Sequence, residues 1–155
     1  MNTKRAAVGG PMCTEKPVTF QRRRLDLRGI RGAVGKGRDF TRHALRDWGW
    51  DRRESAEDAL LVVSELLTNA ALHAGGCHEL VLTAGEDLRI EVVDGDTEPP
   101  RPQAVRRVGV PGGRGLYIVQ RLADGWGSRA HGTGKVVWAE FDASRLTGAP
   151  EGCGR

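Results

Sequence analysis

Apolar and polar positions along the chain repeat with two periods, one typical of strands and one of helices. The clearest helical pattern falls at 55–74, where apolar side chains recur every three or four positions. The predicted elements, in chain order, are an edge strand at 18–27, a helix at about 38–48, a helix at 55–74, strands at 79–84 and 88–94, a helix at 116–123, and strands at 126–130 and 135–141. This order predicts an α/β fold, a two-layer sandwich with helices on one face of a mostly antiparallel sheet.

Turn-forming and capping residues mark the boundaries of these elements. Ser55, followed three positions later by Asp58, resembles a capping box at the start of the long helix. Gly75-Gly76 is expected to end that helix. A glycine-rich turn is expected at 28–37, and Gly85-Glu86-Asp87 is expected to join the first two central strands as a hairpin.

The chain is predicted to form one domain at 18–143 between two flexible tails at 1–17 and 144–155. Both ends are polar and lack periodicity. With 155 residues, of which 39% are hydrophobic, the domain can bury a substantial core. No apolar run approaches the roughly 20 residues that a membrane span requires, so a cytoplasmic protein is expected.

The cysteines do not predict a disulfide framework. Cys13 and Cys153 lie in the expected tails, and three cysteines cannot all pair with one another. His73, Cys77 and His78 lie close together in the sequence and could suggest a metal site. No second pair of ligands matches them, however, so an ordinary thiol after a helix is the favoured interpretation.

Charge is distributed unevenly along the chain. Residues 1–53 carry 14 Lys and Arg against 5 Asp and Glu, whereas the remaining residues carry 10 against 15. Arg22–Arg24 is the densest basic cluster. It is compatible with nucleic-acid contact, with an acidic protein partner, or with a solvated edge, and few aromatic residues lie beside it.

The long helix carries a line of polar residues opposite its apolar stripe. Glu65, Asn69 and His73 are spaced four residues apart and therefore share a face. The stripe consists of Ala56, Ala59, Leu60, Val63, Leu67, Ala70 and Ala74, and the polar line is flanked by Leu61, Val62 and Leu72. This composition favours a polar face covered by a second layer or a ligand over a merely wetted edge.

A glycine-rich turn precedes the third helix. Gly112-Gly113-Arg114-Gly115-Leu116 would let backbone amides approach a phosphate at a helix N-terminus. The turn is not a P-loop and lacks the last glycine of a dinucleotide fingerprint. A plain hinge is the alternative interpretation. The preceding segment at 95–113 is long for a connection, as is typical of lids and binding loops.

Asp94 ends a predicted strand whose other residues are largely apolar. Its carboxylate is therefore expected at the edge of the sheet, where it could accept a hydrogen bond from an exocyclic amine. The alternative is a turn-forming Asp before Gly95.

Five runs occur in an order that resembles a known family. They are Ser64–Ala74, Val92–Asp94, Gly112–Val119, Trp126-Gly127 and Gly134–Glu140. Together they resemble the anti-sigma-factor serine/threonine kinases of the histidine-kinase-like (GHKL) ATPase superfamily, in particular the compact ATP-binding regulators abundant in actinobacteria. The resemblance spans roughly residues 20–141 and implies the histidine kinase-like ATPase fold.

The resemblance implies a role for each matched residue in binding ATP and Mg²⁺. Glu65 would be the general base on the hydroxyl of a protein substrate, and Asn69 would coordinate a Mg²⁺ that bridges the phosphates. Asp94 would bind the adenine amine. The other residues expected at the nucleotide are His73, Gly113, Arg114, Gly115, the backbone of Leu116, and Thr133 through water. Arg114 would meet either a phosphate or a partner protein.

One position departs from the family pattern. The superfamily usually shows Asp-x-Gly at the adenine strand, whereas this chain has Asp94-Gly95-Asp96. A carboxylate therefore stands where the second glycine is expected.

The resemblance also implies partners. The expected substrate is a serine or threonine of a STAS-domain anti-anti-sigma protein, and the expected inhibited partner is a sigma factor. Homodimerisation is expected through the face that bears the first strand and first helix. Two other hypotheses stay open: a non-catalytic ATP-binding module that binds a transcription factor, and direct nucleic-acid binding through Arg22–Arg24 and Arg28.

Overall fold

The structure, a computed structural model, describes residues 20–100 and 115–147. Its elements are β1 (Gln21–Asp26), α1 (Ala33–Asp47), α2 (Glu54–His73), β2 (Cys77–Ala84), β3 (Asp87–Asp94), α3 (Gly115–Leu122), β4 (Gly125–His131), β5 (Gly134–Asp142) and α4 (Ala143–Thr147). The tail predicted at 1–17 and most of the loop predicted at 95–113 lie outside the described residues.

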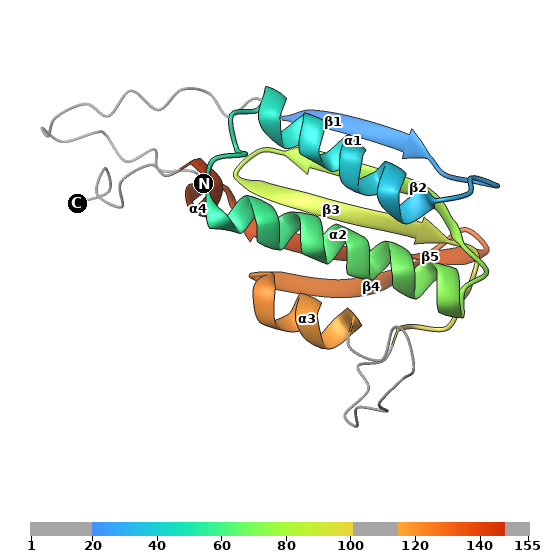
Figure 1. Cartoon of the computed structure of the whole chain (residues 1–155). Helices are drawn as coiled ribbons and strands as arrows, with labels where there is room; N and C mark the ends of the chain where they lie inside the picture. The colour runs from blue at the N-terminus through green and yellow to red at the C-terminus, as the bar shows by residue number, and fades with distance from the viewer. Residues whose placement is uncertain (1–19, 101–114, 148–155) are drawn as a thin grey trace, which may run out of the picture.

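The five strands form one antiparallel sheet in the order β1-β2-β3-β5-β4. Helices α1, α2 and α3 lie on one face of this sheet, with α2 between the other two (Figure 1). Apolar side chains of the central strands alternate toward the helices and form the core, as with Leu88, Ile90 and Val92 of β3, which are fully buried. The predicted two-layer α/β fold is confirmed.

Helix α1 begins earlier than predicted. The glycine-rich turn expected at 28–37 ends at Gly32, whose left-handed backbone (φ 68°) precedes the first helical residue. Gly37 lies inside the helix because α2 packs closely there. A Cβ at Gly37 would overlap with Leu67 Cδ1. Tertiary packing therefore outweighs the low helix propensity of glycine.

The predicted capping box at the start of α2 was wrong. The helix begins at Glu54 after an extended Arg53, and no side chain caps its first turn. Asp58 instead lies 3.9 Å from Arg145, a residue far along the chain. The prediction at the other end holds, since the helix ends at His73 and the amide of Gly76 donates to the carbonyl of Ala70.

The remaining predicted elements are present with shifted ends. Strand β2 begins two residues earlier than expected, β4 and β5 each extend one residue further at both ends, and α3 begins and ends one residue earlier. Strand β1 covers 21–26 of the predicted 18–27, of which 18–19 lie outside the described residues. Element ends defined by hydrogen bonds commonly differ by one or two residues from ends inferred from the hydrophobic period.

Helix α4 occupies the first residues of the segment predicted as a tail from 144. Leu146 is 1% exposed and joins the core, while Arg145 contacts Asp124 at 2.9 Å and lies over the ring of Phe141. Polar composition concealed this docking because a single apolar side chain anchors the helix. Within 20–100 and 115–147, none of the helices combines the length and apolar character needed to cross a bilayer.

Gly134 permits the closest backbone approach among the glycines of the sheet. A Cβ there would overlap with the carbonyl oxygen of Asp94. We expect Gly134→Ala to lower the free energy of unfolding by about 2–3 kcal/mol, because backbone atoms on two strands would have to move. Urea denaturation measures the change.

Gly35→Ala is the matched control. It adds the same methyl group to a helix position with no atom within 4 Å. This control is expected to stabilise the protein by about 0.5–1 kcal/mol. Equal effects of the two substitutions would contradict the steric explanation.

Candidate functional site

Asp94 is a buried carboxylate at the end of β3. It is 3% exposed, and its Oδ1 accepts a hydrogen bond from the Nζ of Lys135 at 3.0 Å and another from the amide of Asp96 at 2.9 Å. Lys135 stands directly opposite Asp94 in the register of β3 and β5. The carboxylate expected at the adenine end is therefore already held by an internal cation.

Lys135 is the residue that sequence reasoning missed. Its side chain is 6% exposed, and its ammonium also donates to the carbonyl oxygen of Asp96 at 3.3 Å. The available signal was the second half of the β4–β5 hairpin, which places Lys135 beside a strand-end Asp once the register is known. Sequence alone does not give that register.

The side chain of Asp96, which stands in place of the expected glycine, is hydrogen-bonded within its own loop. Its carboxylate accepts a hydrogen bond from the amide of Glu98 at 3.0 Å, while its backbone contacts Asp94 and Lys135. The main chain of residue 96 thus takes part in the arrangement around Asp94, whereas the carboxylate that departs from the family pattern contacts Glu98.

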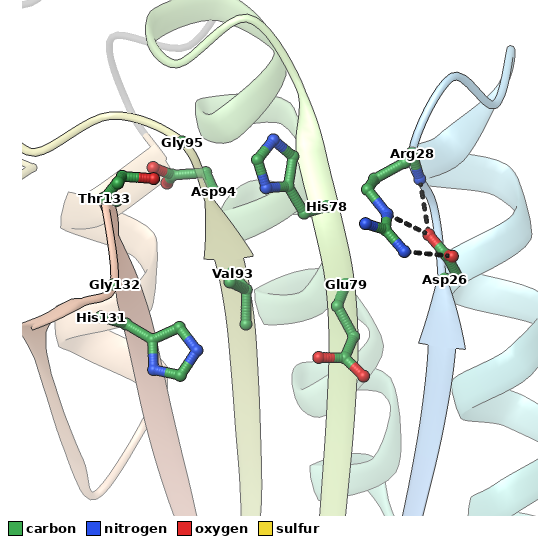
Figure 2. Close-up of a pocket in the computed structure, with 11 residues that line it drawn as sticks. Asp26, Arg28, His78, Glu79, Val93, Asp94, Gly95, His131, Gly132 and Thr133 are labelled. Carbon is green, nitrogen blue, oxygen red and sulfur yellow. Dashed lines mark hydrogen bonds and ion pairs between the residues drawn. The ribbon is translucent and has the colours of Figure 1, made fainter.

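A pocket of about 360 Å³ opens where the strands end. It is lined by Asp94 and Thr133, which were predicted, and by His78, His131 and Arg28, which were not. Thr133 lies on the β4–β5 turn with its side chain toward the Asp94 carboxylate, and His78 lies on the other side of Asp94 (Figure 2). The structure therefore brings together Asp94 and Thr133, two residues 39 positions apart.

Arg28 forms a side wall of this pocket together with Asp26. The guanidinium donates to the Asp26 carboxylate at 3.0 and 3.2 Å, and the Arg28 amide donates to it at 3.0 Å (Figure 2). These bonds, chiefly the one from the Arg28 side chain, lower the pKa of Asp26 to about 2.

The polar line on α2 does not line this pocket. Each step of four residues turns the helix by about 40°, so the line from Glu65 through Asn69 to His73 winds around α2. Ala71 lies on the opposite side, where it shares a pocket with Ala33 of α1. Asn69 and His73 consequently lie on the α3 side of the helix, whereas Glu65 faces away from the sheet.

Glu65 and Asn69 are half-buried, and His73 is exposed. None of the three makes a side-chain hydrogen bond or ion pair with another residue of the described ranges 20–100 and 115–147. Desolvation raises the pKa of Glu65 above its ordinary value. A carboxylate with a raised pKa is better suited to accept a proton near neutral pH.

The flanks of the polar line are more open than the sequence indicated. Val62 is fully buried, but Leu61 and Leu72 are 38% and 48% exposed. Within the described part of the chain, the outer face of α2 is therefore not covered by a second layer. Exposed apolar side chains beside Glu65 are compatible with a ligand or protein surface that covers this face.

The start of α3 adjoins α2, but the glycine turn is only partly described. Gly115 is the first residue of α3, and the Leu116 side chain is 4% exposed and belongs to the core. Gly113 and Arg114 lie outside the described residues. In Figure 1 the end of β3 and the C-terminal end of α2 lie at the same end of the molecule, and the start of α3 is directed toward that end.

The region around His73, Cys77 and His78 does not form a metal centre. Among the residues that the structure describes, no group of three or more His, Cys, Asp or Glu could hold a metal ion. The Cys77 thiol donates to the carbonyl oxygen of Glu79, and burial raises its pKa to about 12, so it stays protonated and is a poor metal ligand.

The basic cluster Arg22–Arg24 is partly neutralised. Arg23 contacts Asp47 at 2.8 Å and lies over the ring of Trp48, and Arg24 lies 3.8 Å from Glu79. These acids reduce the positive field that the sequence alone suggests along β1.

Comparison with known protein families connects this arrangement to one of them. The model of the histidine kinase-like ATPase domain matches residues 31–141, most of the chain. This chain belongs to the histidine kinase-like ATPase domain family. A search of curated proteins found no match. Membership in this family implies ATP binding, and the matched range contains all the residues predicted to form the site. Their individual roles stay predictions.

The raised pKa of Glu65 gives a pH-dependent stability prediction for this ATPase domain. The charged form opposes folding above the folded-state pKa, and this opposition vanishes below about pH 4, where the residue is protonated in both states. Glu65→Gln should therefore raise the melting temperature at pH 7 by a few degrees at most. The gain should fade as the pH falls toward 4.

Glu57→Gln is the matched control on the same helix. Glu57 is exposed in the first turn of α2, where a negative charge is favourable, so its removal should slightly lower the melting temperature at pH 7. Thermal denaturation across pH 3–8 compares the two variants. A loss of stability in Glu65→Gln at pH 7 would contradict the proposed desolvation.

Proposed function

We propose that this ATPase domain is an ATP- and Mg²⁺-dependent protein serine/threonine kinase of the anti-sigma type. It would phosphorylate a STAS-domain anti-anti-sigma partner and sequester a sigma factor. The observation that carries the proposal is the pair Glu65 and Asn69, one turn apart on α2, half-buried and without partners among the described residues. In an ATP-binding family, such a pair has the chemistry that phosphoryl transfer requires.

Phosphoryl transfer depends more on positioning and on charge than on covalent catalysis. The hydroxyl oxygen of the protein substrate would attack the γ-phosphorus, and the bond to the β–γ bridging oxygen would break to release ADP. Glu65 would accept the hydroxyl proton, and its desolvated carboxylate suits that task. Leu61 and Leu72, which flank the polar line, are exposed and would contact the surface of the protein substrate.

The residues present fit a Mg²⁺ ion carried in by the nucleotide. Mg²⁺ prefers oxygen ligands and is commonly held by one or two protein groups together with phosphates and water. The Asn69 amide oxygen would be such a ligand, consistent with the lack of an all-protein metal cluster in the described ranges. The ion would neutralise charge on the phosphates.

At the other end of the nucleotide, Asp94 would accept a hydrogen bond from the adenine amine, with Thr133 nearby on the β4–β5 turn. Gly113, Gly115 and the Leu116 backbone would face the phosphates from the start of α3. His73 and Arg114 complete the proposed set of contacts.

Titration calorimetry with Mg²⁺-ATP tests the binding site. Asn69→Ala and Asp94→Ala should each weaken binding by about 10–100-fold, because each removes a contact to a charged or buried group. With EDTA present, Asn69→Ala and the wild type should bind ATP equally weakly. Undiminished affinity in both variants would place the nucleotide elsewhere.

Phosphate transfer to a cognate STAS-domain partner tests catalysis. Glu65→Ala should lower the transfer rate by about 10²–10⁴-fold while ATP affinity changes little, and Glu57→Ala should behave as wild type. If the wild type binds ATP but yields no phosphoserine or phosphothreonine, the alternative holds, namely a non-catalytic ATP-binding module that binds a transcription factor.

A further inference from the structure

The ammonium of Lys135 has more hydrogen-bonding capacity than its surroundings use. An ammonium carries three N–H donors. Two are directed to Asp94 Oδ1 at 3.0 Å and to the Asp96 carbonyl oxygen at 3.3 Å, and no other described residue accepts the third. Because the side chain is only 6% exposed, little water is available to that third donor.

Among the described residues, the carboxylate of Asp94 has an unused hydrogen-bond acceptor, which complements the unused donor of Lys135. Both of its hydrogen bonds, from Lys135 and from the Asp96 amide, end on Oδ1. Oδ2 accepts no hydrogen bond from another residue of the described ranges. The pair therefore leaves one acceptor and one donor unused by the described residues at the end of the sheet.

The position of this pair is fixed by the backbone. Asp94 and Lys135 are register partners on neighbouring strands, and Gly134 brings the main chain of β5 against the carbonyl of Asp94. Groups held on paired strands keep a more constant geometry than groups on loops.

A role in stability alone is a weak explanation for the pair. Both side chains are nearly fully buried, at 2% and 6% exposure, and a buried ion pair often contributes no more than well-packed apolar residues would. Asp94 of this pair also lines the pocket at the strand ends, so its carboxylate lies where a ligand can reach it.

We propose that Lys135 and Asp94 together recognise the nucleotide base through hydrogen bonds. Asp94 Oδ2 would accept a hydrogen bond from the exocyclic amine of adenine, and the third N–H of Lys135 would donate to the adjacent ring nitrogen N1. The inference rests on the proposed ATP site and adds to it a specificity-determining residue. A carboxylate alone recognises only the amine, whereas the pair recognises a neighbouring donor and acceptor.

A cycle that changes the protein and the ligand together tests the contact. The ligands are Mg²⁺-ATP and 1-deaza-ATP, in which CH replaces N1 and the amine is kept. The wild type should bind 1-deaza-ATP about 10–100-fold more weakly than ATP, as expected for loss of a charged hydrogen bond. Lys135→Met should bind the two ligands with equal affinity.

Two further variants make the cycle specific. Lys36→Met removes an exposed lysine of α1 and should discriminate between the ligands as the wild type does. Lys135→Gln keeps an N–H donor without the charge and should retain a several-fold preference for ATP. If Lys135→Met does not fold, the double variant Asp94→Asn/Lys135→Met, which lacks both charges, replaces it. This double variant is also expected to bind ATP and 1-deaza-ATP with equal affinity.

The outcomes separate this inference from the proposed function. If the wild type does not bind Mg²⁺-ATP, the proposed ATP site fails and the base-reading role fails with it. If the wild type binds ATP but Lys135→Met, or the double variant, keeps the full preference over 1-deaza-ATP, Lys135 is a structural partner of Asp94 and only the inference is overturned.

Discussion

Helix α2 packs against other elements on three sides, and this packing determines which of its side chains can be polar. Its apolar stripe packs on the sheet, while α1 and α3 lie along its two flanks (Figure 1). The close contact between Gly37 and Leu67 brings α1 tightly against it. The outward strip that remains carries Glu65, which is half-buried and partly desolvated, and the half-buried Asn69 lies beside it toward α3. Packing that stabilises the core thus also creates the environment in which a carboxylate has a raised pKa.

The other part of the site lies at the end of the sheet, where the strand register determines which residues meet. Antiparallel pairing sets Lys135 opposite Asp94, and the following loop contributes the main chain of Asp96. Buried charge is handled in a similar way on the sheet face away from the helices, where Glu91, only 7% exposed, lies between Arg89 and Arg129. In both places a buried charge lies against an opposite charge: Lys135 of the neighbouring strand β5 pairs with Asp94, whereas Glu91 pairs with Arg89 of its own strand and with Arg129 of β4. An unpaired charge would be costly there.

Prediction from the sequence succeeded where the signal is local and periodic. The types and order of the helices and strands up to β5, the two-layer fold and the superfamily were obtained correctly, because apolar period and glycine turns act within a few residues. Prediction failed where the local structure depends on contacts with a segment that is distant in the chain. Gly37 of α1 packs against Leu67 of α2, α2 begins at Glu54 before the expected cap Ser55, and α4 docks on the core through Leu146.

The sequence by itself determined which chemical groups are present: a carboxylate and an amide one helical turn apart at Glu65 and Asn69, and a strand-end acid at Asp94. Only the tertiary structure decided what surrounds them. The pairing of Asp94 with Lys135 depends on the β3–β5 register, and the desolvation of Glu65 depends on the packing around α2. Spacing along a helix or strand is fixed by local geometry, whereas burial and ion pairing depend on segments that are distant in the chain and meet only in the folded state.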